Sequence, residues 1–262
     1  MKKRKVHHEL PVSIWEEVGQ FAMESLSDWA DLQRVNRALR TAMHHPRVFQ
    51  YFNLSFKDPS FTLKIGSMNR AVRKATIRKC AVTFDVDAYD VPDLMAMGPM
   101  PALQSLDVSG MMRCIPRVPD LPSLTELKLT CPRLWDMSGL AQWPTLTKVD
   151  LSGCQDAGLH WLCQLPNLAT LKLSSHFQVR NISYLTGMRA LTDLDLSHCT
   201  QLTNDHLKVV SRLVTLRKLS LAHTKISNVN MLSTLVNLEH LDVSHTRVVE
   251  TSLAGKIDIL FQ

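Results

Sequence analysis

The chain has 262 residues, 45% of them hydrophobic and 21% charged, which is enough to bury a large core and excludes a largely disordered protein. No apolar run approaches the length of a transmembrane helix, and no apolar segment follows the basic start. We therefore expect neither a membrane protein nor a secretory or mitochondrial targeting peptide. Six cysteines without a signal peptide favour reduced thiols in the cytoplasm, the nucleus or both.

The first predicted unit is a basic tail, residues 1–9. The formal net charge of the chain is +6, and four of the positive charges lie in "KKRK", Lys2 to Lys5. This run matches a short nuclear-import signal, and it also fits an ordinary solvated terminus. Both interpretations stay open.

Residues 10–48 are predicted to form a small helical domain. In "LPVSIWEEVGQFAM", Ile14, Val18 and Phe21 fall on one face of a helix that has Pro11 near its first turn. A second helix is expected after the cap-like Ser27. Its apolar stripe consists of Trp29, Leu32, Val35, Leu39 and Met43.

This segment resembles the F-box family. The family pattern begins Leu-Pro, continues through two helices to Val-Cys-Arg-x-Trp, and closes with Asp-Pro-x-x-Trp-x-x-Leu-x-Leu. The matching residues here are Leu10, Pro11, Asp28, Trp29, Val35, Arg37, Pro46, Phe52 and Leu54. The sequence departs from the pattern at Asn36, which replaces the cysteine, and at Leu39 and Phe49, which replace tryptophans.

The resemblance implies a partner, because F-boxes dock the Skp-type adaptor of cullin-based SCF ubiquitin ligases. On that interpretation eight residues divide between the domain core and an apolar patch for the adaptor. They are Leu10, Pro11, Ile14, Val18, Trp29, Leu32, Val35 and Leu39. The alternative is a helical cap that shields the apolar end of the domain that follows.

Residues 49–262 are predicted to form a repeat domain. The template L-x-x-L-x-L recurs seven times at steps of 21 to 25 residues, starting at Leu103, Leu124, Leu146, Leu168, Leu191, Leu216 and Leu238. Degenerate copies begin at Phe49 and Val72, and "AGKIDI" from Ala254 is a candidate shortened last strand. Stacked copies predict an α/β solenoid with parallel strands on its concave face.

The unit "LTDLDLSHCTQLTNDHLKVV" resembles the cysteine-containing subtype of the leucine-rich-repeat family, which implies an amphipathic helix after each strand. Template position 9 reads Cys80, Met111, Pro132, Cys154, His176, Cys199, Thr224 and Thr246. We expect a small buried group there that satisfies backbone polar groups of the loop. Cys199 is therefore interpreted as a structural thiol, and Met111 and Pro132 break the pattern.

Template positions 2, 3 and 5 are expected to project onto the concave face, where repeat proteins usually bind. Opposite charges alternate there, so the strands are predicted to neutralise one another largely by cross-strand pairing. The face is neither basic nor aromatic, which makes nucleic acid an unlikely ligand and a protein surface the expected one. The candidate partner-binding residues are Glu126, Lys128, Lys148, Asp150, Lys172, Asp193, Asp195, Lys218, His240 and Asp242.

Three further candidates, His198, His223 and His245, all occupy template position 8. At the spacing of parallel strands they should form a surface ladder whose outer members lie too far apart for one tetrahedral zinc ion. A Cys-His catalytic pair at His198 and Cys199 would lack an oxyanion site and an orienting third residue. We therefore predict no metal, no cofactor and no catalytic residue, and leave open whether the ladder contacts a partner or is only solvated.

The sequence thus predicts a protein-interaction adaptor rather than an enzyme. The leading hypothesis is the substrate-recognition subunit of an SCF-type ubiquitin ligase, in which the F-box docks a Skp-type adaptor and the cullin complex. The repeat arc would bind an unidentified client protein. The alternative is a scaffold in an assembly unrelated to ubiquitin, with the F-box-like helices as a cap or tether. A nucleic-acid-associated protein would rest only on "KKRK" and the basic run "RAVRKATIRK".

Overall fold

The computed structural model describes residues 51–56, 79–84, 100–110, 120–133, 138–154, 159–175, 181–249, 251–255 and 257–261. The predicted tail, 1–9, and the F-box-like segment, 10–48, lie outside the described residues. Within the described part of the chain, no helix is long and apolar enough to cross a membrane.

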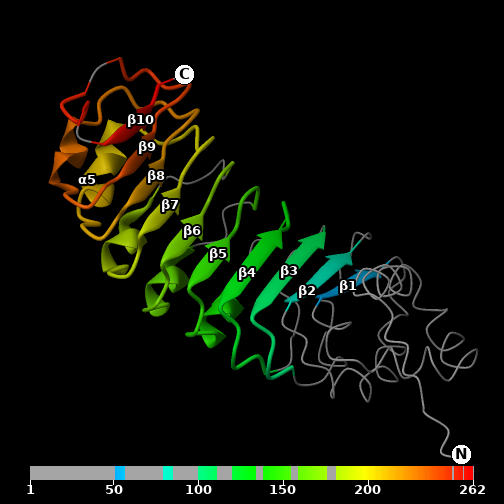
Figure 1. The fold of residues 1–262 in the computed structure, drawn as a ribbon. Helices are drawn as coiled ribbons and strands as arrows, with labels where there is room; N and C mark the ends of the chain where they lie inside the picture. Colours follow the sequence, from blue (N-terminus) through cyan, green and yellow to red (C-terminus); the bar gives the residue numbers. More distant parts are fainter. Residues whose placement is uncertain are drawn as a thin grey trace, which may run out of the picture.

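Ten parallel strands form one sheet in sequence order (Figure 1). The strands are β1 Tyr51–Phe56, β2 Lys79–Phe84, β3 Ser105–Gly110, β4 Glu126–Thr130, β5 Lys148–Asp150, β6 Thr170–Lys172, β7 Asp193–Asp195, β8 Lys218–Ser220, β9 His240–Asp242 and β10 Asp258–Leu260. Each strand pairs only with its neighbours along the chain. The predicted repeat solenoid is confirmed.

The core lies directly behind this sheet and follows the repeat template. The leucines at template position 1, from Leu103 to Leu238, are at most 4% exposed, and the apolar residues at positions 4 and 6 are equally buried. Burying one such side chain contributes about 1.5–3 kcal/mol. Because each copy presents the same three positions, stacking makes one continuous core along the array.

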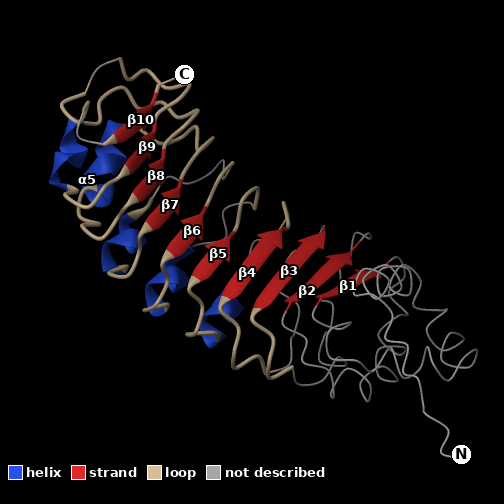
Figure 2. Ribbon diagram, viewed as in Figure 1, coloured by secondary structure: helices blue, strands red, loops and turns tan. Residues whose placement is uncertain are grey.

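Short helices connect the strands on the opposite, convex side (Figure 2). They are η3 Ser138–Gln142, η4 Leu159–Gln164, η5 Ser183–Gly187, η6 Asn204–His206, α5 Leu207–Val210 and η7 Asn230–Thr234. All but α5 are 3₁₀ helices, so the amphipathic α-helix expected after each strand is wrong for most of the described repeats. Among the described residues, the one α-helical turn occurs in the repeat between Leu191 and Leu216, which has the longest step; shorter steps leave room only for a tight 3₁₀ turn.

Two predicted registers differ in the structure. Lys79 of β2 aligns with Ser105 of β3, so this copy begins at Ile77 rather than Val72. Cys80 is therefore a strand residue paired with Leu106, not a residue of template position 9. The strand "KCAVTF" has four apolar residues and one charged residue, whereas "VRKATI" has three apolar and two charged residues, which favours the observed pairing.

The last strand is also shifted. Asp258 of β10 aligns with His240, so the final copy begins at Lys256, two residues after the predicted start at Ala254. A shift of two residues keeps the same side chains on each face, because the side-chain period of a strand is two. Ile259 accordingly packs against the core, and Asp258 joins the concave face.

Candidate functional site

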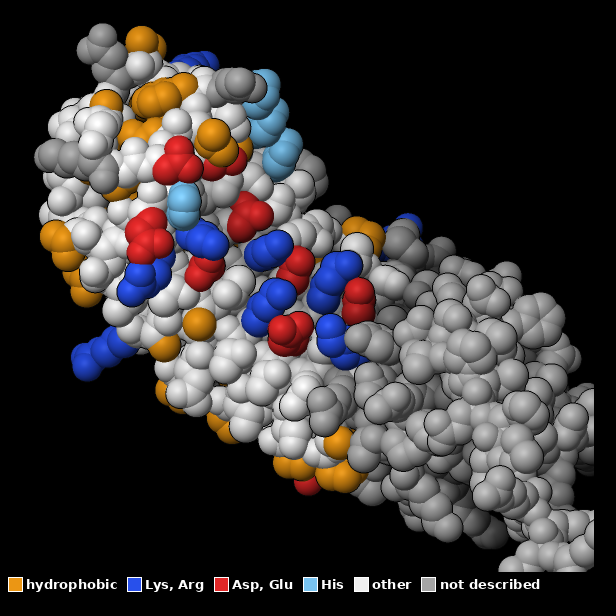
Figure 3. Space-filling view, in the orientation of Figure 1, with side chains coloured by type: hydrophobic (Ala, Val, Ile, Leu, Met, Phe, Trp, Pro, Cys, Tyr) orange, Lys and Arg blue, Asp and Glu red, His pale blue; other side chains and the backbone are white. Residues whose placement is uncertain are grey.

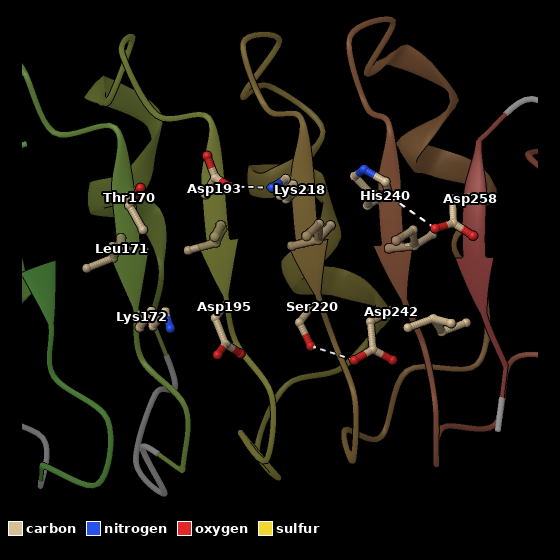
Figure 4. A pocket seen from close by; sticks show the side chains of 14 residues that line it. Thr170, Leu171, Lys172, Asp193, Asp195, Lys218, Ser220, His240, Asp242 and Asp258 are labelled. Carbon is tan, nitrogen blue, oxygen red and sulfur yellow. Dashed lines mark hydrogen bonds and ion pairs between the residues drawn. The ribbon is translucent and has the colours of Figure 1, made fainter. Parts of the chain in front are cut away.

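The concave face carries two rows of polar side chains. Residues alternate along each strand, so template positions 3 and 5 point away from the core while the leucine between them is buried. Figure 4 shows the rows over β6 to β10, with Asp193, Lys218 and His240 in one row and Asp195 and Asp242 in the other. Every predicted concave-face residue from Glu126 to Asp242 lies in one of these two rows.

In the half of the face that begins at β3, opposite charges pair across strands. The Lys128 ammonium lies 3.3 Å from an Asp107 carboxylate oxygen, and that of Lys148 lies 4.0 Å from Glu126. Blue and red side chains accordingly alternate over the middle of the array in Figure 3. Exposed cross-strand pairs of this kind contribute roughly 0.2–1 kcal/mol each. Here the predicted self-neutralisation is confirmed.

The half of the face that ends at β10 is different. An open groove of about 470 Å³ covers β6 to β10, and its charged lining holds four aspartates, Asp193, Asp195, Asp242 and Asp258, against only two lysines, Lys172 and Lys218. Lys218 lies 3.9 Å from Asp193, and His240 Nδ1 lies 3.1 Å from Asp258. The predicted neutralisation is therefore incomplete here, and with His240 neutral the groove lining carries two excess negative charges.

Lys172 shows why charge pairing is incomplete in this half. Its register neighbours are Asp150 on β5 and Asp195 on β7. Among the described residues, Lys172 forms no ion pair within 4.0 Å with either aspartate. Both carboxylates bind the chain instead: Asp150 Oδ1 accepts a hydrogen bond from the Ser152 N–H at 3.0 Å, and Asp195 Oδ1 accepts one from the Ser197 N–H at 2.9 Å.

Asp242 has the same local structure and more partners. Its Oδ1 accepts hydrogen bonds from the N–H and the hydroxyl of Ser244 at 3.0 and 2.7 Å, and its Oδ2 accepts one from the Ser220 hydroxyl at 3.1 Å. Such Asx turns hold a carboxylate in place where the strand ends. They orient these aspartates without cancelling their charge.

The predicted histidine ladder is confirmed. The rings of His198 and His223 stack with centroids 4.1 Å apart and planes at 12°, and those of His223 and His245 stack at 4.1 Å and 17°. All three side chains are exposed, and a row of histidines lines one rim of the face in Figure 3. Ring nitrogens point within the ring planes, so those of stacked rings do not converge on one ion. The described residues contain no group of three or more His, Cys, Asp or Glu that could hold a metal.

The backbone of the ladder has a feature that the sequence analysis missed. His198, His223 and His245 adopt φ values of 58°, 56° and 55°, in the left-handed region. Gly153 occupies the same template position with φ 76° and Ser175 with φ 60°. This conformation aims the position-8 N–H at the next repeat: His198 N donates to the Ala222 carbonyl at 2.8 Å. Glycine at this position in two copies, Gly110 and Gly153, was the signal for a positive φ.

Neighbouring imidazoles lower the pKa of His223. Partial desolvation is the largest cause, followed by the charges that His198 and His245 would carry, while Asp242 acts in the opposite direction. The ladder and the aspartate row are thus close enough to interact electrostatically. The central imidazole resists protonation while its neighbours are charged.

The buried thiols are structural. Cys131, Cys154 and Cys199 are at most 1% exposed, and each donates a hydrogen bond to a backbone carbonyl of the preceding repeat: Val108 in β3 at 3.6 Å, Leu129 in β4 at 3.3 Å and Leu173, just after β6, at 3.2 Å. Burial raises the pKa of Cys131 to about 12 and that of Cys154 to about 11. The structural interpretation of Cys199 is confirmed. Cys131 fills the place that we had assigned to Pro132, one residue earlier in its loop.

Comparisons with known proteins show the fold. A leucine-rich-repeat protein of Leptospira interrogans aligns with a TM-score of 0.62 and 22% identity over 82% of this chain and 53% of that one. InlP of Listeria monocytogenes aligns at 0.60 and 18% over 94% and 69%. The leucine-rich-repeat domain of the type III effector XopL aligns at 0.50 and 16% over 99% and 98%. The chain has the leucine-rich-repeat fold.

At these identities the likeness concerns the fold alone, and the chain spans about half the length of the Leptospira leucine-rich-repeat protein. No protein-family model matches the sequence, and no curated protein matches it. The predicted adaptor-binding residues, from Leu10 to Leu39, lie outside the described residues. The F-box resemblance therefore stays a prediction from the sequence.

Proposed function

We propose that this leucine-rich-repeat protein is a non-enzymatic interaction scaffold whose concave face binds a client protein. The observation that carries this proposal is the continuous sheet of ten parallel strands, with ordered charged rows on its open face. No described feature favours catalysis: the thiols of Cys131 and Cys154 are held protonated near neutral pH, and the stacked histidines are exposed to solvent.

The proposal extends to the ubiquitin system through the N-terminal segment. The "LP" start at Leu10 and Pro11, the two helical patterns and the position before a repeat array support an F-box that binds a Skp-type adaptor. The scaffold would then bring its client to a cullin-based ligase, in the cytoplasm or nucleus.

Co-expression with a Skp-type adaptor tests this extension. We expect a stable complex that survives gel filtration and is lost on Leu10→Ala plus Pro11→Ala. The matched control is Asp195→Asn plus Asp242→Asn on the concave face, which should keep the adaptor. A well-folded protein that forms no complex would refute the F-box assignment.

The second candidate is a scaffold in an assembly unrelated to ubiquitin, favoured by the departures from the F-box pattern at Asn36, Leu39 and Phe49. Affinity purification from the native cells, followed by quantitative mass spectrometry, distinguishes the two. Recovery of the adaptor together with a cullin supports the ligase subunit. Recovery of an adaptor without a cullin supports the tether.

The client site has its own test. A full chain with Lys128→Glu, Lys148→Glu, Asp193→Lys and Asp258→Lys should lose a client that the unmodified chain retains, while its Tm changes little because these side chains lie outside the core and none of them closes an Asx turn. If the same client still binds to the charge-reversed face, the concave-face proposal is wrong.

A further inference from the structure

The part of the concave face that ends at β10 combines three properties: an open groove, excess negative charge and a histidine ladder along its rim. We propose that this groove docks a lysine- or arginine-rich segment of the client protein, and that protonation of the histidines releases it. The inference rests on the proposed scaffold function and specifies the chemistry of the client.

The charge balance of the groove selects a cationic occupant. The Asp107–Lys128 and Glu126–Lys148 pairs account for the charges on β3 and β4, whereas the groove keeps four aspartates against two lysines. An anionic or neutral segment would leave this excess uncompensated, and potential complementarity is what steers and orients charged partners.

The aspartates are held ready to accept further hydrogen bonds. A carboxylate offers about four lone-pair sites. Asp195 Oδ1 uses one of them for the Ser197 N–H, and all the hydrogen-bond donors to Asp242 are neutral groups of serines. Asp193 and Asp258 are partly exposed, at 35% and 67% of their side chains, beside Lys218 and His240. An added guanidinium or ammonium group can therefore reach carboxylates that are already oriented.

The spacing of the aspartates suits an extended chain. Asp195 on β7 and Asp242 on β9 are two strands apart, with Ser220 between them. Two strand spacings are about 9.6 Å, close to the rise of three residues in a polyproline II segment, about 9.3 Å, and three residues per turn return every third side chain to the same face. A segment that crosses the strands with a basic residue at every third position would place successive cations over these two carboxylates.

The histidines give the groove a dependence on pH. His223 and Asp242 interact electrostatically, and His240 lies beside Asp258 inside the groove. The other charged residues within three positions of a ladder histidine are Asp195, at the end of β7, and Lys225 and Arg247, which come two residues after His223 and His245. Imidazoles become cationic between about pH 8 and pH 5. Their protonation would turn the excess negative charge of this region into an excess of positive charge and repel a basic segment.

The test uses the full chain and two capped, fluorescent peptides that carry either arginine or glutamate at every third position, with serine and glycine elsewhere. Fluorescence anisotropy at about pH 8 should show binding of the arginine peptide only. Asp195→Asn plus Asp242→Asn keeps both Asx-turn acceptors but removes two charges, and should weaken binding about tenfold. Asp205→Asn, which removes an exposed carboxylate in η6 on the convex side, should change the Kd less than about twofold.

The pH arm compares the unmodified chain with His198→Asn, His223→Asn and His245→Asn combined, since asparagine tolerates the left-handed backbone. Lowering the pH to about 5.5 should weaken binding of the arginine peptide at least about tenfold in the unmodified chain and clearly less in the variant. Full pH dependence in the triple variant would overturn the role of the ladder.

Equal or tighter binding of the glutamate peptide, no effect of the double aspartate variant, or no binding of either peptide would overturn the basic-segment inference. These outcomes differ from a failure of the proposed function. If the charge-reversed chain loses its client although the arginine peptide does not bind, only the inference fails. If that chain keeps its client, the scaffold site itself is wrong.

Discussion

The left-handed backbone of the histidine ladder predicts that glycine is more stabilising than alanine at these positions. Both His223→Ala and His223→Gly remove the imidazole, so the loss of stacking cancels in the comparison. At φ 56° an alanine retains a penalty of about 1–2 kcal/mol, whereas glycine loses about 0.5–1 kcal/mol more conformational freedom on folding. The free energy of unfolding of His223→Gly should therefore exceed that of His223→Ala by about 0.5–1 kcal/mol.

The same exchange at all three ladder positions enlarges the effect. Three alanines against three glycines at His198, His223 and His245 should differ by about 2 kcal/mol, a clear shift of the urea midpoint. Alanine and glycine at Lys225, an exposed residue outside the left-handed region, serve as the control, and there alanine should be favoured by about 0.5–1 kcal/mol. Alanine variants of the ladder that equal or exceed the glycine variants in stability would refute the backbone argument.

Three further predictions follow from other parts of the molecule. In the native protein a thiol reagent should label the exposed Cys163 rapidly, and Cys131 and Cys154 only on unfolding. Burial raises the pKa of the two buried thiols above 9.0, so the contribution of the protonated thiols to stability should be lost as the pH rises above that value. Urea titrations at increasing pH measure this loss. Asn204→Ala should lower the free energy of unfolding by about 1–2 kcal/mol, because the Asn204 side chain accepts hydrogen bonds from two backbone N–H groups of the next repeat and donates one to a serine. Asn204→Asp keeps the acceptor oxygen and should lower it less. Equal losses in the two variants would contradict this account. Because the pKa of His223 is lowered in the folded protein, this imidazole takes up a proton more readily in the unfolded chain. The stability of the unmodified chain should therefore fall as the pH drops below about 6.5, and that of His223→Asn should fall less. Identical stability–pH profiles for the two chains would contradict the electrostatic coupling.

The strands and core were predictable because both follow from a short period in the sequence. Seven copies of L-x-x-L-x-L place three apolar positions in the core and the intervening positions on the concave face, and the structure confirms this from Leu103 onward. Where a copy lacks leucines, the period cannot distinguish competing registers. The copies that begin at Ile77 and Lys256 were accordingly shifted from their predicted starts at Val72 and Ala254.

The charge pattern was predictable as a list of residues but not as a set of interactions. Alternating signs at template position 5 suggested mutual neutralisation, and the Asp107–Lys128 pair follows it. Asp195 departs from it because the Ser197 N–H, two residues later, occupies its Oδ1 while Lys172 on β6, also a described residue, forms no ion pair with it. Asp242 departs from it because its register neighbours are Ser220 and Leu260 rather than lysines. The order of charges along the sequence does not show whether an aspartate carboxylate will bind a lysine on the neighbouring strand or a backbone N–H two residues later.

That competition links the fold to the proposed site. The Asp-x-Ser sequence that ends β7 and β9 closes an Asx turn immediately before the left-handed histidine, so one aspartate both shapes the strand exit and leaves charge on the concave face. Replacing Asp195 or Asp242 with alanine would alter the turn, the ladder and the charge together. Asparagine removes the charge and keeps the Asx turn, because its side-chain oxygen still accepts the backbone N–H of Ser197 or Ser244; at Asp242 its amide nitrogen replaces the oxygen that accepts the Ser220 hydroxyl, and that hydroxyl can accept from the amide instead. The isosteric substitution therefore separates the structural role of these residues from their role in recognition.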